Sequence, residues 1–367
     1  MPTRELSTVS IPYVSLPNGQ DPLDPSKSLN LSTLGPSSEN VGIFAYHEQK
    51  RGHALNILQI SGGGQYGAFG AGFLNAWQAT GMRPEFDIVT GVSAGALTAT
   101  HAFLGSPEDD KVISDIFTSI DKKNIYKRRT LLRVLMGSDS LFDTTPLEEL
   151  LKSVITPEVL MRVAAAADDN RQLWVGTTNL DYNQTWAWNM TLIAQENKPG
   201  ALDLYRKVLL ASASMPVAFP PVEIDGHLFA DGGIRANILV HGLVENKAPK
   251  APLYEGGNVF VIHNEPRTSA PAPLQPNLQG IASTVFAQMM SASVESVLLR
   301  SYYSAKAHGY QFNMVDIPDD VPVGKNPLAF DKVEMKAAFD AGVAAANESQ
   351  PWQHTPPNMG DYPDWAL

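Results

Sequence analysis

Three glycine-rich segments hold the side chains most able to do covalent chemistry, and one of them contains Ser93. This serine stands in the sequence Gly-Val-Ser-Ala-Gly of residues 91–95, between an apolar run and a helical pattern. Such a junction is typical of a nucleophile on a sharp strand-to-helix turn, because only small neighbours let the backbone fold back far enough to expose the hydroxyl. A motif this short also arises by chance among 28 glycines, so an ordinary glycine-rich turn is the alternative.

The other two segments are the glycine run Gly62, Gly63 and Gly64 and the Asp-Gly-Gly sequence that begins at Asp231. Glycines between a strand and a helix leave backbone N–H groups free to approach a ligand, which suits a developing oxyanion in acyl transfer. Asp231 could take the proton of the Ser93 hydroxyl. The combination predicts a serine nucleophile, a carboxylate base and an oxyanion hole at the glycine run.

The elements that must position these residues alternate between strand and helix. Apolar runs at 54–60 and 86–90 each lead through glycines into a helical pattern that ends near Gly81 or Gly105. Further buried strands are expected at 173–178 and 259–263, a helix start capped by Thr145, and a late helix that opens at Asp331 and reaches about Ala346. Successive strand-helix units predict an α/β fold with three α/β/α layers and a central, mostly parallel sheet.

The domain organisation follows from length and composition. At 367 residues and 44% hydrophobic content, the chain can bury one large core. Residues 1–50 are rich in Ser, Pro, Asn and Leu without periodicity and predict an extended arm. We expect the catalytic domain at 51–347 and a tail without periodicity at 348–367.

The charge and the residue types narrow the classes of function. A net charge of −11 argues against nucleic-acid binding, and the absence of cysteine excludes thiolate nucleophiles, disulfides and cysteine metal sites. The sequence has no apolar leader and no run near the ~18 apolar residues of a membrane span. We therefore expect a soluble chain, either cytoplasmic or exported after removal of a signal segment. The basic stretch Lys122–Arg133 could contact an anionic lipid surface or form a solvated helix face.

With these motifs the chain resembles the patatin-like phospholipase family. In that family the loop D/S-G-G-G-x-R/K-G precedes G-x-S-x-G, and D-G-G/A lies much later; residues 61–67, 91–95 and 231–233 match in this order. The resemblance covers about residues 54–346. It implies a patatin-like fold and hydrolysis of acyl esters of lipids, of the phospholipase A or lipid acyl hydrolase type. It also implies a Ser93–Asp231 dyad that needs neither histidine, metal nor organic cofactor.

Two departures from the family pattern stand near the predicted site. Tyr66 replaces the basic residue of the glycine loop, which removes a cation and leaves the backbone amides, aided by Gln65, to stabilise the oxyanion. This loss motivates the alternative that the chain is a non-catalytic lipid-binding protein with the same fold. The pair Asn237-Ile238 stands where the family commonly has Asn-Pro, and we interpret it as a local variation without catalytic meaning.

Two other site types compete with the dyad. Residues 62–67 also fit G-x-G-x-x-G with Asp87 about twenty residues on, but Asp87 falls at the start of its strand rather than at the end that a dinucleotide site requires. A serine triad would need a histidine, and those available are His101, eight residues after Ser93, and, after Asp231, His241, His263, His308 and His354. We interpret the histidines as structural because the resemblance implies a dyad.

Overall fold

A computed structural model of the chain describes residues 54–119, 122–128, 140–169, 171–196, 199–240, 257–266, 278–307, 309–324 and 326–357, without the side chains of residues 122, 124, 128 and 278–292. The expected arm at 1–50 and the second half of the expected tail, residues 358–367, lie outside the described residues.

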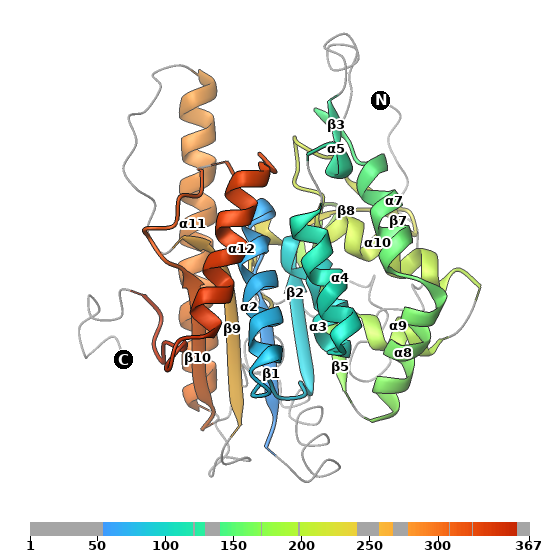
Figure 1. Ribbon diagram of the computed structural model, residues 1–367. Helices are drawn as coiled ribbons and strands as arrows, with labels where there is room; N and C mark the ends of the chain where they lie inside the picture. Colours follow the sequence, from blue (N-terminus) through green and yellow to red (C-terminus); the bar gives the residue numbers. More distant parts are fainter. Residues whose placement is uncertain are drawn as a thin grey trace.

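A central sheet organises the described part of the chain (Figure 1). Its strand order is β10-β9-β1-β2-β5-β8-β7, and β6 pairs with β5. The first five strands of this order run parallel to one another, whereas β6, β7 and β8 pair antiparallel. The bounds are β1 Asn56–Ile60, β2 Ile88–Val92, β5 Gln172–Asn179, β6 Gln184–Asn189, β7 Val222–Ile224, β8 His227–Asp231, β9 Asn258–Pro266 and β10 Gln311–Ile317. The expected mostly parallel α/β sheet is confirmed.

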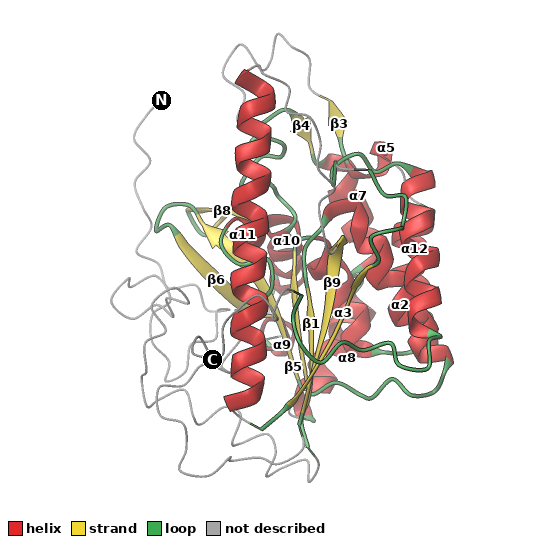
Figure 2. Ribbon diagram, turned by 90° about the vertical axis from the view of Figure 1, so that its left-hand side faces the viewer, coloured by secondary structure: helices red, strands yellow, loops and turns green. Residues whose placement is uncertain are grey.

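Helices cover both faces of the sheet. Figure 2 shows the long helix α11 on one face and α2, α3 and α12 on the other. The bounds are α2 Gly67–Ala79, α3 Ala94–Leu104, α4 Pro107–Thr118, α5 Lys122–Ile125, α7 Thr145–Val154, α8 Pro157–Asp168, α9 Met190–Gln195, α10 Ala201–Ser212, α11 Leu278–Ala307 and α12 Lys332–Ala346. The short strands β3 (Lys127–Arg128) and β4 (Phe142–Asp143) pair separately, and single 3-10 turns occupy η2 Gly64–Tyr66 and η3 Gly232–Ile234. Among the described helices, none is long and apolar enough to cross a bilayer.

Alternation along β1 explains why the parallel strands read as continuous apolar runs. Leu58 and Ile60 belong to the core cluster that includes α2 and α3, whereas Leu55 and Ile57 belong to the second cluster, which includes residues of α11. Both faces of a parallel strand are covered, so apolar side chains occur at positions that point to either face. The sheet is thereby fixed from both sides.

One predicted helix start is wrong by one residue. Thr145 was expected as the cap, but α7 begins at Thr145, and the Asp143 carboxylate accepts its amide at 2.8 Å. The Asp143 side chain thus caps the first turn of α7 from two residues upstream of Thr145. The late helix begins after Asp331, whose carboxylate accepts from the amides of Val333 and Glu334, and it ends at Ala346 as expected.

The start of the expected tail packs on the core. Trp352 stacks edge-on against Phe73 and Trp77, with ring centroids 5.0 and 4.9 Å apart, and also contacts Phe260. Gln353 bridges to Met314 of β10 through two backbone hydrogen bonds of 2.8 Å. This part of the chain is therefore held by the sheet and by α2.

Candidate active site

Ser93 sits on a strained turn between β2 and α3. Its backbone has φ 53° and ψ −124°, a conformation that L-residues rarely adopt. The flanking glycines make the turn possible: a Cβ on Gly91 would lie 2.6 Å from the Gly95 carbonyl oxygen, and one on Gly95 would lie 2.4 Å from the Ile60 carbonyl oxygen. Such a turn raises the serine hydroxyl above the end of its strand.

The backbone of Ser93 is also held by a second serine. The Ser93 amide donates to Ser212 Oγ at 2.9 Å, and Ser212 Oγ donates in turn to the Gly176 carbonyl at 2.7 Å. Ser212 is fully buried at the end of α10. It thus ties the turn to β5 and α10.

Asp231 lies against the Ser93 hydroxyl. Ser93 Oγ donates to Asp231 Oδ2 at 2.6 Å, and the Gly233 amide donates to Asp231 Oδ1 at 2.7 Å. Strand pairing brings the aspartate there, because β2 and β8 both flank β5, where Thr177 pairs with Asp231. Asp231 is 1% exposed, and burial raises its pKa to about 7 despite the two hydrogen bonds. A carboxylate with such a pKa can take and return a proton near neutral pH.

The glycine run covers Ser93 from the other side. A Cβ on Gly62 would lie 3.0 Å from Ser93 Cβ, and Gly63 and Gly64 have φ values of 141° and 57°. The Gly62 amide donates to the Asn237 carbonyl at 3.1 Å, so Gly62, contrary to the prediction, is not a free oxyanion donor. Within the described residues, the amides of the half-buried Gly63 and Gly64 have no acceptor, so these two amides can donate to a bound group.

The side chains of Tyr66 and Gln65 form hydrogen bonds elsewhere and do not face a group bound at Gly63 and Gly64. The buried Tyr66 hydroxyl donates to the Gly324 carbonyl, and burial, followed by Glu334 and Glu265, raises its pKa. The fully buried Gln65 donates to the Asn326 carbonyl at 3.1 Å and to Glu334 at 2.5 Å. The expected help of Gln65 to an oxyanion is therefore wrong, because its amide is already used. Both side chains anchor the glycine run to the segment before α12.

None of the described histidines hydrogen-bonds to Ser93 or Asp231. His263 is 5% exposed within β9, and burial lowers its pKa to about 4, with Asp316 acting in the opposite direction. His354 Nδ1 lies 3.0 Å from the Phe312 carbonyl. His241 and His308 lie outside the described residues.

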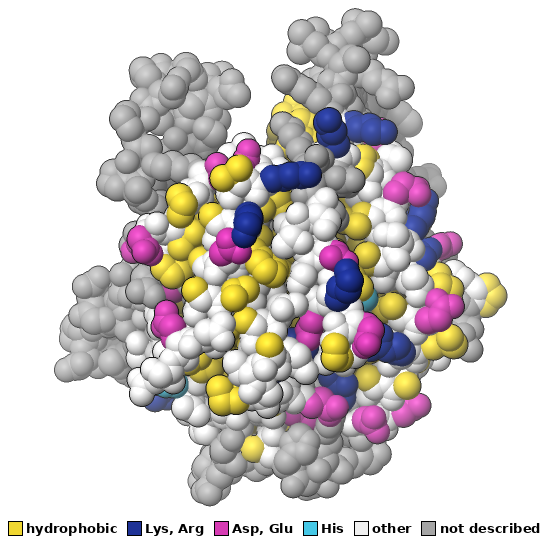
Figure 3. All heavy atoms as spheres, viewed as in Figure 1, with side chains coloured by type: hydrophobic (Ala, Val, Ile, Leu, Met, Phe, Trp, Pro, Cys, Tyr) yellow, Lys and Arg dark blue, Asp and Glu magenta, His cyan; other side chains and the backbone are white. Residues whose placement is uncertain are grey.

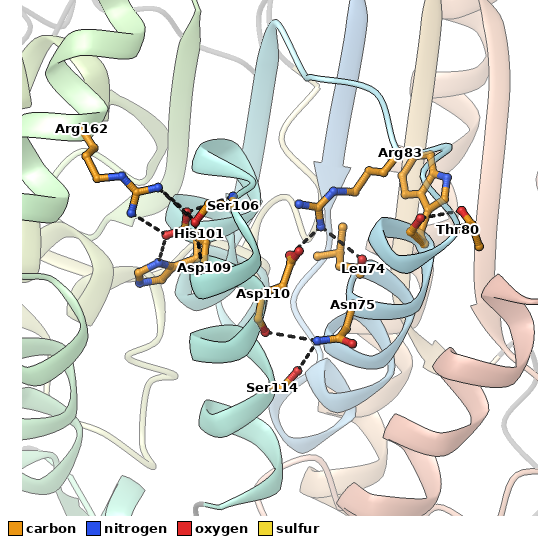
Figure 4. Close-up of polar contacts among 11 residues, drawn as sticks. Leu74, Asn75, Thr80, Arg83, His101, Ser106, Asp109, Asp110, Ser114 and Arg162 are labelled. Atoms are coloured by element: carbon orange, nitrogen blue, oxygen red, sulfur yellow. Dashed lines mark hydrogen bonds and ion pairs between the residues drawn. The ribbon is translucent and has the colours of Figure 1, made fainter.

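His101 belongs to a polar cluster with Ser106, Asp109 and Arg162 (Figure 4). Its Nδ1 lies 2.8 Å from Asp109 Oδ1, and Asp109 also accepts from Arg162 and from the Ser106 hydroxyl. Burial would raise the pKa of Asp109, but these hydrogen bonds outweigh it and lower that pKa. The cluster joins α3, α4 and α8, so His101 has a structural role.

The geometry at Asp87 disfavours a dinucleotide site. Asp87 directly precedes β2 and is fully buried, where its Oδ2 accepts from the Asn56 amide at 2.8 Å. A carboxylate buried at the start of the strand cannot reach a ribose at the other end of the sheet.

Asn237, Glu265 and Ser212 lie around the glycine run and Ser93 without having been assigned to the site from sequence. Asn237 is 2% exposed; its carbonyl accepts from Gly62, and its Nδ2 donates to Glu265 Oε1 at 3.1 Å. The only sequence signal was the position of Asn237, six residues after Asp231. Glu265 belongs to no motif.

Comparison with known proteins gives one family and several distant relatives. The family model of patatin-like phospholipases matches residues 58–244, just over half of the 367 residues, and the matched range contains Ser93 and Asp231. The uncharacterised protein R571 of Acanthamoeba polyphaga mimivirus is 26% identical over 213 residues, which are 58% of this chain and 67% of that protein.

Two solved structures are also similar. VipD from Legionella pneumophila matches with a TM-score of 0.43 and 14% identity, over 80% of this chain and 67% of that one. The complex of SpcU with ExoU from the type III secretion system of Pseudomonas aeruginosa matches with a TM-score of 0.33 and 16% identity, over 70% of this chain and 51% of that one.

Proposed function

The chain belongs to the patatin-like phospholipase family, and we propose that it hydrolyses the acyl esters of lipids with Ser93 as nucleophile and Asp231 as general base. The single observation that carries the proposal is the 2.6 Å hydrogen bond from Ser93 Oγ to a carboxylate whose pKa burial raises to about 7. A base with this pKa can accept the serine proton in one step and return it in the next.

The reaction divides into acylation and deacylation. In acylation, Ser93 Oγ forms a bond to the ester carbonyl carbon while its proton passes to Asp231 Oδ2. The carbonyl oxygen becomes an oxyanion that the Gly63 and Gly64 amides stabilise. The tetrahedral intermediate collapses, the bond to the alcohol oxygen breaks, and the alcohol leaves with the proton from Asp231.

In deacylation, water attacks the acyl group on Ser93 and gives a proton to Asp231. The bond from the acyl carbon to Ser93 Oγ then breaks, the serine recovers its proton from Asp231, and the fatty acid is released. The proposed steps use water together with side chains and backbone of this chain.

The test compares wild type with Ser93→Ala and Asp231→Asn, and Ser153→Ala serves as a control because Ser153 is exposed on α7. Hydrolysis of p-nitrophenyl butyrate and labelling by a fluorophosphonate probe are measured on protein with an unchanged circular dichroism spectrum. We expect loss of at least a thousandfold in kcat for both site variants and labelling that depends on Ser93. Folded wild type that is neither active nor labelled would instead favour the non-catalytic lipid-binding protein.

We further propose that the chain contacts an anionic membrane surface beside this site. Of the basic stretch Lys122–Arg133, the structure describes residues 122–128, in which Lys123 and Lys127 are exposed. Next to β3 and β4 lie Leu141 and Val217, which are 42% and 72% exposed. The Leu141 amide donates to the Val217 carbonyl at 3.0 Å, which holds the two residues side by side. Cations beside apolar side chains suit a lipid headgroup layer.

Figure 1 places α5 and β3 at the end of the molecule where the carboxyl ends of β1 and β2 also lie. Figure 3 shows Lys and Arg side chains beside hydrophobic ones at the same upper end. A membrane bound there would face the carboxyl ends of the strands, where Ser93 follows β2. This placement supports delivery of a lipid ester to the nucleophile.

A further inference from the structure

Glu265 is a carboxyl group near Ser93 that the proposed reaction leaves unused. It stands near the end of β9, which pairs with β1, the strand that leads into the glycine run. Its Oε1 accepts from Asn237 Nδ2 at 3.1 Å, and its Oε2 lies 3.8 Å from His263 Nε2. The side chain is 29% exposed, yet burial raises the pKa of its carboxyl to about 7.

Asn237 connects this carboxyl group to the glycine run. Its carbonyl accepts the Gly62 amide at 3.1 Å, and its Oδ1 occupies the space beside the Gly62 Cα, 2.2 Å from where a Cβ would be. Gly62 in turn packs on Ser93, so the contacts form an unbroken series from Glu265 through Asn237 and Gly62 to the nucleophile. A small rotation of the Asn237 side chain would therefore shift the backbone of the glycine run.

We propose that Glu265 is a positioning residue: by accepting from Asn237 Nδ2, it fixes the Asn237 side chain and thereby the place of the glycine run relative to Ser93. The inference rests on the proposed function, since it concerns the oxyanion donors of that reaction. Glu265 itself touches neither the ester nor Ser93.

The chemistry of the two groups supports this assignment. An ionised carboxylate only accepts hydrogen bonds, so the NH2 end of the Asn237 amide faces Glu265 and the oxygen end faces Gly62. With the amide reversed, two hydrogens would press on Gly62 and the two oxygens would repel each other. A carboxyl group that titrates near pH 7 keeps an accepting oxygen in either protonation state, and His263, whose pKa burial lowers to about 4, stays neutral beside it.

The expected kinetic signature is a loss of kcat with little change in KM. Oxyanion donors act on the transition state, so their displacement slows the chemical step without weakening ground-state binding. A displacement of about 1 Å at such a site lowers the rate by up to about a hundredfold. A residue that only stabilises the fold would lower the midpoint of thermal unfolding and leave kcat of the folded fraction unchanged.

The experiment measures kcat, KM and Tm for Glu265→Ala, Glu265→Gln, Asn237→Ala and the Asn237→Ala/Glu265→Ala double variant on p-nitrophenyl butyrate. Glu223→Ala is the control, because Glu223 is an exposed carboxylate on β7. We expect Glu265→Ala to lose tenfold to a hundredfold in kcat, and Glu265→Gln, which keeps an accepting oxygen, to recover at least a third of the wild-type value. We expect the double variant to lie within twofold of Asn237→Ala, because the two residues act through one contact.

The proposal is overturned if Glu265→Ala keeps kcat within threefold of wild type, if Glu265→Gln is as slow as Glu265→Ala, or if the losses in the double variant multiply. Should Glu265→Ala not fold, Glu265→Met replaces it under the same criteria, because Met preserves the volume. Fully active wild type with an unaffected Glu265→Ala variant defeats this inference alone. Folded wild type without esterase activity and without Ser93 labelling defeats the proposed function and this inference together.

Discussion

Gly62 and Ser93 are in such close contact that a methyl group on Gly62 would lie 3.0 Å from Ser93 Cβ and 2.2 Å from Asn237 Oδ1. Neither neighbour can give way, because Ser93 is held on its strained turn and Asn237 is buried. Gly62→Ala is therefore expected to lower kcat at least tenfold and to destabilise the fold by about 1–3 kcal/mol. Steady-state kinetics and urea unfolding check the two effects. Wild-type kcat in this variant would show that the glycine run can move away without loss.

The pKa of Asp231 predicts how activity depends on pH. Because burial raises this pKa to about 7 and the base acts deprotonated, kcat/KM should rise through pH 7 and then level off. The pH profile of p-nitrophenyl butyrate hydrolysis, corrected for the uncatalysed rate, measures this. A profile that is flat between pH 5.5 and 8.5 would contradict the assigned base.

The same pKa predicts how stability depends on pH. The folded-state pKa of Asp231 lies above the unfolded value, so its contribution is complete below about pH 4 and is lost as the pH rises through 7. Asp231→Asn removes this loss. We expect the variant to gain stability relative to wild type from pH 4 to pH 8, measured by urea unfolding at both values. An equal difference at both pH values would mean that Asp231 is ionised without penalty.

Tyr66 is expected to be a structural residue. Its hydroxyl donates to the Gly324 carbonyl, and its ring is buried. Tyr66→Phe should lose about 1 kcal/mol of stability while kcat stays within threefold of wild type. A fall in kcat of tenfold or more at unchanged KM would place the hydroxyl in the reaction instead.

The cluster around Asp109 should contribute to stability without contributing to catalysis. The Asp109 carboxylate is almost fully buried between His101 and Arg162. Asp109→Ala would leave these donors unpaired, so we expect a loss of about 3 kcal/mol, with kcat of the folded protein unchanged. Because its hydrogen bonds lower the pKa of Asp109 despite burial, this stabilisation is present above about pH 4 and is lost as the pH falls further. Urea unfolding from pH 7 downward, with kinetics at pH 8, tests both statements.

Val217 allows a test of membrane contact. This residue is 72% exposed with φ 70°, a conformation that suits asparagine better than a β-branched side chain. Val217→Asn should keep or raise Tm yet lower hydrolysis of phosphatidylglycerol vesicles at least threefold, while hydrolysis of soluble p-nitrophenyl butyrate stays within twofold. Met161→Gln on α8, also an exposed apolar position, is the control. Equal losses on vesicles and on the soluble ester would remove Val217 from the contact surface.

The sequence was sufficient for the parts of the fold that depend on local pattern. Local patterns, either apolar runs or a helix cap, indicate several elements directly. These are strands β1, β2, β5 and β9, the turn at Ser93 and the helix after Asp331. The contact between Ser93 and Asp231 was inferred from motifs alone, because the two residues are 138 positions apart in sequence and no local signal indicates their proximity.

Long-range hydrogen bonds account for what sequence reasoning missed. Gly62 was expected to donate to an oxyanion, but the Asn237 carbonyl takes its amide. Gln65 was expected at the oxyanion, but acceptors from the segment before α12 and from Glu334 take its side chain. Glu265 has no neighbouring motif, and only the pairing of β9 with β1 brings it to the site. Which acceptor binds each of these amides depends on the groups that the tertiary fold brings close to it. A local sequence pattern does not contain this information.

The anchoring of Gln65 has a consequence for the order in which the protein acquires activity. The bonds from Gln65 to Asn326 and Glu334 span 261 and 269 residues, so the glycine run beside Ser93 is anchored only when α12 and the segment before it have docked. A chain emerging from the ribosome would carry Ser93 and Asp231 well before it carries the segment that anchors the glycine run. Under the proposed function, activity toward lipid would therefore be acquired only after docking of α12, the final helix among the described residues.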